Sequence, residues 1–299
     1  MDNARKFSAD LAQEYPFEPH YFEQPYGTNS VARQHYLDEG TGPVVVMLHG
    51  NPTWSFYFRN CIRHLKEKGF RCIVPDHIGC GLSDKPKDYS YTLEQRIQDT
   101  ERLLNALKIR QFSLIVHDWG GAIGMGLAVR NSEKVERIAI LNSGAYRFEH
   151  MPKRIGLLRT FGLGQFLIRG FNLFAWPATF MSVKAPLSST VKEGFLFPYN
   201  SWANRIAVWN FVKDIPMSAS HRSYKCLSDI EARLEVLRGK KIRIFWGQED
   251  FCFNDHFLKR WMKIFPEAKT TLYKDAGHYI LEDAEKEIIP AISEFLVAQ

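Results

Sequence analysis

Short apolar runs alternate with helical patterns along most of this 299-residue chain, and this alternation restricts the fold more than any other feature. Runs typical of buried strands occur at 31–37, 43–48, 71–75, 111–116, 135–141, 241–246 and 269–273. Helical patterns fall between them, at 56–68, 93–107, 119–130, 230–237, 256–264 and 282–297. Strands that alternate with helices indicate a mostly parallel sheet with helices on both faces. The sequence therefore predicts an α/β fold.

The alternation changes at two places. Residues 21–23 and 31–37 flank the turn-forming residues Gly27, Thr28 and Asn29, which predicts an antiparallel hairpin at one edge of the sheet. Between 146 and 224 no clear strand pattern occurs, and the composition shifts to Phe, Leu, Trp, Gly, Pro and Arg. A pattern that breaks and resumes is typical of an insertion into one domain. We expect a core formed by 1–145 and 225–299, and a helical cap at 146–224, called the cap segment below.

Composition excludes several classes of protein. With 45% hydrophobic and 24% charged residues, the chain can form one large core. The formal charge is +6, but basic and acidic residues are interspersed, which argues against a nucleic-acid-binding stripe. The first residues lack the apolar core of a signal peptide, and the apolar stretch 170–183 is too short to cross a bilayer. Five dispersed cysteines without C-x-x-C spacing are typical of reduced thiols: Cys61, Cys72, Cys80, Cys226 and Cys252. We expect a cytoplasmic protein without a metal or cofactor.

An acidic residue, Asp118, lies where the strand at 111–116 is expected to turn sharply into the helix at 119–130. Gly120 and Gly121 open that helix and allow it to approach the sheet closely. In the related G-x-S-x-G turn the central residue is a serine nucleophile. A carboxylate in its place can displace a leaving group from saturated carbon and form an ester that water opens later. The alternative is that Asp118 only caps the helix.

Other polar residues also follow predicted strands. Asn51 follows 43–48, Trp119 follows Asp118, Asp250 follows 241–246, and His278 follows 269–273. The carboxyl ends of parallel strands lie at one edge of a sheet, so these side chains are expected to converge. Each has a structural reading: Asn51 as a turn residue, Trp119 as a core anchor, Asp250 as a helix cap, and His278 as a loop histidine. Taken together, nucleophile, acid and histidine in this order favour a catalytic triad.

The motifs HGNPTWS at 49–55, GCGLSDKP at 79–86, HDWG at 117–120 and AGH at 276–278 resemble those of haloalkane dehalogenases of the α/β-hydrolase superfamily. The resemblance covers essentially the whole chain. It implies that Asp118 is the nucleophile, His278 the base and Asp250 its orienting carboxylate. It also implies that the side-chain N–H groups of Asn51 and Trp119 bind the departing anion, while their backbone N–H groups form an oxyanion hole.

Three longer strings, at 75–86, 250–258 and 276–284, are similar to the β-lactone decarboxylases of bacterial long-chain olefin biosynthesis, an offshoot of the dehalogenase family. This resemblance implies that cis-3,4-dialkyl-oxetan-2-ones are converted to cis-alkenes and carbon dioxide. It also implies an assembly with neighbouring enzymes of that pathway. A strained lactone resembles an alkyl halide because it offers an electrophilic carbon and releases an anion. Attack at the saturated ring carbon and attack at the carbonyl both stay open here.

Three other functions stay open as well. A haloalkane dehalogenase would hydrolyse 1-haloalkanes with the same residues. An epoxide hydrolase would need cap tyrosines to protonate the epoxide oxygen, and Tyr146, Tyr199 and Tyr224 are available. A non-catalytic binding protein on this fold would be expected to lose the nucleophile or the histidine.

The cap segment also carries many large apolar residues, which we expect to pack on the core or to line a tunnel for two alkyl chains. An exposed remainder would indicate a partner or a membrane surface. These residues are Leu157, Leu158, Phe161, Leu163, Phe166, Leu167, Phe171, Phe174 and Trp176.

Overall fold

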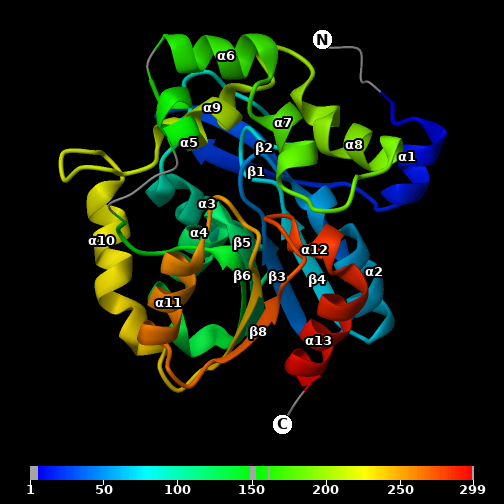
Figure 1. Cartoon of the computed structure of the whole chain (residues 1–299), viewed down its shortest axis with the longest axis vertical. Coiled ribbons are helices and arrows are strands. Elements are labelled where there is room, and N and C mark those ends of the chain that lie inside the picture. Colours follow the sequence, from blue (N-terminus) through cyan, green and yellow to red (C-terminus); the bar gives the residue numbers. More distant parts are fainter. Residues whose placement is uncertain (1–5, 149–152, 161, 298–299) are drawn as a thin grey trace.

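A single eight-stranded sheet forms the centre of the computed structural model, which describes residues 6–148, 153–160 and 162–297 (Figure 1). Its strands are β1 (His20–Tyr26), β2 (Ser30–Glu39), β3 (Val44–Leu48), β4 (Arg71–Pro75), β5 (Phe112–Asp118), β6 (Val135–Ser143), β7 (Lys241–Gly247) and β8 (Lys269–Tyr273). The spatial order is β1-β2-β4-β3-β5-β6-β7-β8. β1 and β4 both pair antiparallel with β2, and all further neighbours are parallel. The mostly parallel sheet and its edge hairpin are thus confirmed.

Helices lie on both sides of the sheet and above it. They are α1 (Ala9–Glu14), α2 (Arg59–Glu67), α3 (Leu93–Ala106), α4 (Trp119–Arg130), α5 (Lys153–Leu158), α6 (Leu163–Phe171), α7 (Ala175–Met181), α8 (Ser189–Leu196), α9 (Ile206–Lys213), α10 (Tyr224–Arg233), α11 (Asp255–Ile264), α12 (Ile280–Asp283) and α13 (Glu285–Val297). Short 3-10 turns are η1 (Ser55–Phe58), η2 (Ser132–Lys134), η3 (Phe197–Tyr199) and η4 (Leu234–Leu237).

The sheet separates two hydrophobic cores. Val45 and Met47 of β3 face the core shared with α2 and α13, whereas Val46 and Leu48 face the core shared with α3, α4, α10 and α11. Successive strand residues point to opposite faces, so a strand covered on both sides must be apolar throughout. This is why the central strands are continuous apolar runs, and why every residue of β5 is buried.

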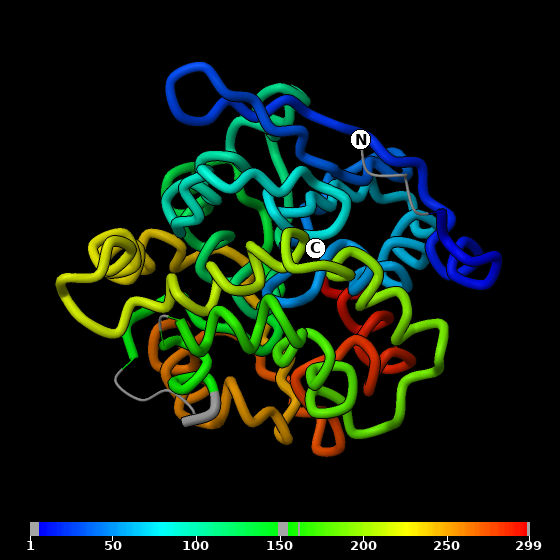
Figure 2. The backbone as a smooth tube through the Cα atoms, turned by 90° about the horizontal axis from the view of Figure 1, so that it is seen from above, coloured from blue at the N-terminus to red at the C-terminus, as the bar shows by residue number. Residues whose placement is uncertain are grey.

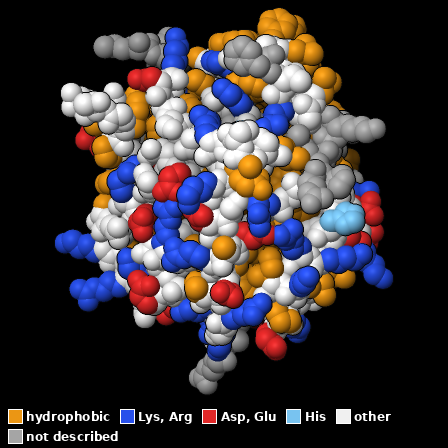
Figure 3. Space-filling model, turned by 90° about the vertical axis from the view of Figure 1, so that its left-hand side faces the viewer, with side chains coloured by type: hydrophobic (Ala, Val, Ile, Leu, Met, Phe, Trp, Pro, Cys, Tyr) orange, Lys and Arg blue, Asp and Glu red, His pale blue; other side chains and the backbone are white. Residues whose placement is uncertain are grey.

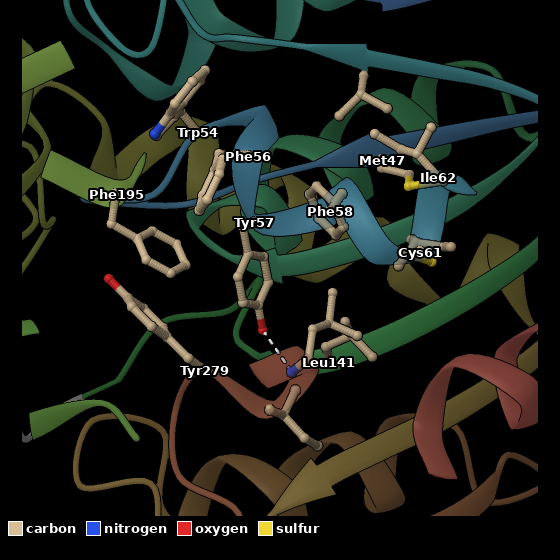
Figure 4. Packing of buried hydrophobic residues seen from close by; sticks show 14 of the residues in the cluster. Met47, Trp54, Phe56, Tyr57, Phe58, Cys61, Ile62, Leu141, Phe195 and Tyr279 are labelled. Carbon is tan, nitrogen blue, oxygen red and sulfur yellow. Dashed lines mark hydrogen bonds between the residues drawn. The ribbon is translucent and has the colours of Figure 1, made fainter. Parts of the chain in front are cut away.

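The described residues of the cap segment form α5 to α9 and η3, with no strand among them. They lie at the top of the molecule, and from above they cross over the rest of the chain (Figures 1 and 2). Phe195 of α8 packs between Phe56 and Tyr279, with ring centroids 5.2 and 4.9 Å away (Figure 4). The Trp54 indole donates to the Gly194 carbonyl at 3.0 Å. These contacts hold the segment on the sheet, while the division into core and cap domains stays a prediction.

Three predicted helices differ from those in the structure. The helix expected at 56–68 is divided into η1 and α2. The helix expected at 230–237 begins at Tyr224, continues to Arg233 and ends in η4. Its start was missed because the first turn is polar and shows no apolar period. Packing of Leu227 and Ile230 into the core stabilises that turn. The helix expected at 282–297 is two helices, α12 and α13, with Ala284 between them.

Candidate active site

Asp118 is the last residue of β5 and has a strained backbone conformation. Its φ is 52° and its ψ is −127°, in a region that non-glycine residues rarely occupy. Close neighbours make this turn sterically demanding. A Cβ added to Gly50 would lie 2.0 Å from Asp118 Oδ1, and one on Gly120 would lie 1.9 Å from the Leu48 carbonyl oxygen. The sharp turn therefore depends on glycine at both positions.

The two oxygens of the Asp118 carboxylate have different surroundings. Oδ1 accepts a hydrogen bond from the Asn51 backbone N–H at 2.7 Å, and the Trp119 backbone N–H also bonds to the carboxylate. The backbone groups expected as an oxyanion hole thus bind Asp118 itself, and Oδ2 faces His278. Burial raises the pKa of Asp118, although His278 and these two N–H groups oppose the shift. Apart from the bond to Trp119, the first residue of α4, the side chain makes no hydrogen bond that caps the helix, so the capping interpretation is not supported.

His278 lies between two carboxylates. Its Nδ1 donates to Asp250 Oδ2 at 2.7 Å, and its Nε2 is 3.6 Å from Asp118 Oδ2. The other oxygen of Asp250 accepts from the backbone N–H groups of Cys252 at 2.7 Å and Phe253 at 3.0 Å, which fixes the carboxylate. Burial by itself lowers the pKa of His278, but the charge and hydrogen bond of Asp250, with Asp118, outweigh burial and raise it.

Neighbouring groups fix the imidazole further. The Phe253 ring stacks on it with centroids 5.6 Å apart and planes at 13°. His117 Nε2 donates to the His278 carbonyl at 2.8 Å, which connects the His278 backbone to β5. The helix-capping alternative for Asp250 loses its basis, because Asn254 caps α11 by accepting from the His256 N–H at 3.0 Å.

Asn51, Trp119, Asp118 and His278 line one cavity of about 250 Å³. The Asn51 amide nitrogen donates to the Val208 carbonyl at 3.1 Å. An amide nitrogen carries two hydrogens, so a second donor remains. The structure therefore brings all five predicted site residues together, with Asp250 behind His278, but it directs one N–H of Asn51 to the cap segment instead of the cavity.

The rest of the cavity wall is almost wholly apolar. The cap segment contributes the largest share, with Tyr146, Phe148, Ile155, Leu158, Leu173, Phe174, Pro177, Ala178, Met181, Ser182, Val212, Ile215 and Pro216. Such a site suits a lipophilic ligand that carries one reactive polar group. Of the apolar residues singled out in the sequence, Leu158 and Phe174 line this cavity, and Phe161 lies outside the described residues.

The three cap tyrosines are unsuited to protonating an epoxide. Tyr146 lines the cavity, but its hydroxyl donates to the Phe257 carbonyl at 2.6 Å. The buried Tyr199 hydroxyl donates to the Thr53 carbonyl at 3.2 Å. Tyr224 bonds to Arg147 and does not line the cavity. The epoxide hydrolase alternative therefore loses the side chains on which it depended.

A second buried network, centred on Asp76, was missed at the level of sequence. Asp76 Oδ2 accepts from His35 Nδ1 at 2.8 Å and from the Leu82 N–H at 2.9 Å, and Oδ1 accepts from the Ser55 N–H at 2.7 Å. Burial alone would raise the pKa of Asp76, but the His35 ring and the backbone donors lower it to about 2. No local pattern signals this network, because its members come from separate segments. It fixes the loops beside the site but does not line the cavity.

Three further observations bear on the sequence predictions. All five cysteines are free, as expected. Within residues 6–148, 153–160 and 162–297, no three His, Cys, Asp or Glu side chains are grouped so as to hold a metal ion. In the same part of the chain, no helix has the length and apolarity needed to cross a membrane.

Comparison with known proteins gives consistent matches. The model of the alpha/beta hydrolase fold family matches residues 43–285. A cis-3-alkyl-4-alkyloxetan-2-one decarboxylase of Shewanella oneidensis is 46% identical over 94% of this chain and 89% of its own length. A protein of the same name from Xanthomonas campestris pv. campestris is 40% identical, over 87% and 91%. The crystal structure of the haloalkane dehalogenase DbeA from Bradyrhizobium elkani superposes with a TM-score of 0.82 at 22% identity, covering 93% of this chain and 98% of that one.

Proposed function

The chain belongs to the α/β-hydrolase fold family and, within it, to the family of the two oxetanone decarboxylases, and on this premise we propose that it decarboxylates cis-3,4-dialkyl β-lactones to cis-alkenes. The observation that carries the proposal is the Asp118 carboxylate in an apolar cavity, with Oδ2 toward His278 and Oδ1 held by the Asn51 backbone N–H. The similarity to the two decarboxylases supports the choice of substrate class.

In the proposed reaction, Asp118 Oδ2 attacks the saturated ring carbon that carries the ring oxygen. The carbon–oxygen bond of the ring breaks, and the former lactone becomes a free carboxylate on an ester-linked intermediate. The carboxylate is then lost as carbon dioxide. Its bonding electrons form the double bond, and the ester carbon–oxygen bond breaks, which returns the carboxylate to Asp118. The sequence consumes neither water nor a proton.

Attack at the saturated carbon accounts for the stereochemistry of the proposed product. Displacement inverts that carbon, and an anti elimination of carbon dioxide and the Asp118 carboxylate follows. Inversion followed by anti elimination equals an overall syn loss of carbon dioxide. A cis-lactone then gives a cis-alkene.

The other site residues have matching tasks in this proposal. The remaining N–H of Asn51 and the Trp119 indole N–H donate to the carboxylate released by ring opening. His278, held as an imidazolium by Asp250, stabilises the negative charge that returns to Asp118 Oδ2 during elimination. Asp118, Asn51 and Trp119 fit the hydrolysis of a 1-haloalkane equally well, with His278 then acting as base for water. Haloalkane hydrolysis is therefore the second candidate.

Two assays separate these functions. Purified protein receives cis-3,4-dialkyl β-lactones in one assay and 1-bromoalkanes in the other, with alkene and halide release measured separately. We expect cis-alkene from the lactone, little halide, and no product from Asp118→Asn. Efficient halide release without alkene would instead make the protein a haloalkane dehalogenase.

Isotope labelling tests the route. After many lactone turnovers in ¹⁸O-water, the mass of the Asp118 peptide should stay unchanged, because elimination returns the original carboxylate oxygens. Incorporation of ¹⁸O into Asp118 would show that water opens the ester and would contradict the elimination step.

A further inference from the structure

The outer surface of the cap segment is apolar and aromatic. More than half of the exposed large hydrophobic side chains in the described part of the chain fall between 157 and 202. We call this group the cap patch: Leu157, Leu163, Phe166, Phe171, Leu173, Trp176, Phe180 and Trp202. Phe171 is 62% exposed, and Phe166 and Trp176 are each 53% exposed. A patch of this composition on a protein surface marks an interaction site.

The aromatic members of the cap patch form two clusters. Phe166 lies 5.2 Å from Phe171 and 6.5 Å from Trp202, and Trp176 lies 5.1 Å from Phe180, between ring centroids. Hydrophobic side chains gather at the upper edge of the face in Figure 3, the end at which α6 lies in Figure 1, with Lys and Arg side chains below them. The patch therefore contains clustered aromatic side chains rather than only scattered single residues.

Two of the helices that carry the cap patch, α5 and α7, also form part of the roof of the cavity. On α5, Leu158 lines the cavity while Leu157 is exposed. On α7, Pro177 and Ala178 line the cavity while Trp176 and Phe180 are exposed. At α5 and α7 one layer of helix thus separates members of the cap patch from the cavity, whereas no residue of α6 lines it.

The charge beneath the cap patch is positive. The sequence from 155 to 193 contains Arg159, Arg169, Lys184 and Lys192 and one acid, Glu193, and Lys184 pairs with Glu249 at 3.2 Å. Arg169 lies 4.6 Å over the Trp202 ring and donates to the Trp202 carbonyl, and Arg205 donates to the carbonyls of Tyr199, Arg169 and Gly170. Within the described residues, no carboxylate forms an ion pair with Arg169 or Arg205. Neither guanidinium is therefore neutralised by a carboxylate, but Arg169 is only 8% exposed, so of the two only the half-buried Arg205 reaches the surface.

We propose that the cap patch docks on the surface of an anionic phospholipid bilayer. Exposed aromatic side chains on a segment with an excess of basic residues are the combination that binds the interface of such a membrane, by apolar burial together with attraction to lipid headgroups. Membrane docking would place the roof of the cavity against the phase into which a dialkyl substrate partitions. This last step, delivery of substrate from the bilayer, rests on the proposed function, whereas the docking surface does not.

Vesicle flotation without substrate tests the docking surface. The full chain is mixed with vesicles of phosphatidylcholine, or of phosphatidylcholine with about one third phosphatidylglycerol. We expect binding to the anionic vesicles that weakens as salt is added. The variant Phe166→Glu/Trp176→Glu should lose at least ~10-fold of that binding. The matched control is Met262→Glu, which alters a side chain of similar exposure (46%) on α11 and should bind like wild type.

Each other outcome counts against the proposal. Equal binding of wild type and the double variant would overturn it, as would absence of binding to anionic vesicles. If the double variant instead changes an oligomer into a monomer during size-exclusion chromatography, with no vesicle binding by wild type, a second copy of the chain covers the patch. Thermal melts and turnover of a short-chain lactone establish that the variant is folded. Because flotation needs no substrate, its result is independent of whether the proposed reaction is correct.

Discussion

At the scale of single residues, His278 lies between two carboxylates that have different roles in the proposed reaction. Its Nδ1 donates to Asp250, while its Nε2 faces Asp118 across 3.6 Å. In the proposed elimination the imidazolium is the active form, whereas haloalkane hydrolysis needs the neutral ring as a base. The two reactions therefore depend on opposite protonation states of the same residue.

This difference predicts the pH dependence of kcat/KM for the lactone. Burial raises the pKa of Asp118 above the ordinary aspartate pKa of ~4. On acidification, activity should therefore begin to fall at a pH above ~4. The pKa of His278 is raised, because the effect of Asp250 outweighs that of burial. The imidazolium therefore persists above pH ~6.5, the ordinary pKa of histidine. Activity should fall only as the pH rises through the raised pKa of His278. Full activity well into the alkaline range would show that the neutral ring is the working form.

The variant Asp250→Asn tests the same argument. Without the carboxylate, the alkaline fall should move to lower pH, and turnover at neutral pH should drop at least ~100-fold. An asparagine oxygen can still accept from the Cys252 and Phe253 N–H groups, so the loop should keep its shape. Glu249→Gln, next to it and 52% exposed in its side chain, is the matched control and should act like wild type.

At the scale of elements, the turn from β5 to α4 depends on space. A Cβ on Gly120 would overlap the Leu48 carbonyl oxygen, which belongs to the backbone of β3 and cannot rotate away. We expect Gly120→Ala to lower the free energy of unfolding by about 3 kcal/mol. Gly170→Ala in α6 is the control, because its Cβ would meet no atom nearer than 3.7 Å. Helix propensity should leave that variant unchanged or raise its stability by up to ~1 kcal/mol. Denaturant titration of both variants measures the difference, and equal stability would contradict the steric argument.

The Asp76 network predicts a loss of stability in acid. The pKa of Asp76 is about 2 in the folded chain, below its ordinary value of 3.8, so the ionised group stabilises the fold above that value and loses this effect as the pH falls through about 2. The shift corresponds to about 2 kcal/mol. In denaturant titrations, the difference in unfolding free energy between wild type and Asp76→Asn should shrink by that amount between neutral pH and pH ~2. The exposed Asp229→Asn is the control, and its difference from wild type should change much less.

The elements themselves were largely predictable, because burial on both faces imposes apolar strands. The hairpin and every parallel strand follow from local pattern, and Asp118, Asp250 and His278 follow from their positions after strands. The start of α10 and the Asp76 network were not predictable. Each is fixed by contacts between segments far apart in the chain, which no local period records.

At the scale of the whole molecule, the cap segment and the sheet together enclose the cavity. The sequence indicated that many cap residues are apolar but could not separate those that line the cavity from those that face outward. Leu157 and Leu158 are adjacent in sequence, but Leu157 is 55% exposed whereas Leu158 lines the cavity. Which side of each short helix faces inward depends on how the cap packs on the core.

That packing predicts how chain length is selected. Ala178 on α7 lines the cavity beneath the cap, so Ala178→Trp fills part of its volume of about 250 Å³. Loss of apolar contacts for a few methylene groups is worth about tenfold or more in kcat/KM. We expect this loss of kcat/KM for a β-lactone with two long alkyl chains. We expect little change for a short-chain lactone, because Asp118, His278 and Asp250 are untouched. Phe180→Trp, on the outer face of the same helix, is the matched control and should leave both substrates unaffected. An equal loss for long and short lactones would mean that Ala178→Trp disturbs the catalytic groups. No loss for either would place the alkyl chains elsewhere, outside the space between the cap segment and the sheet.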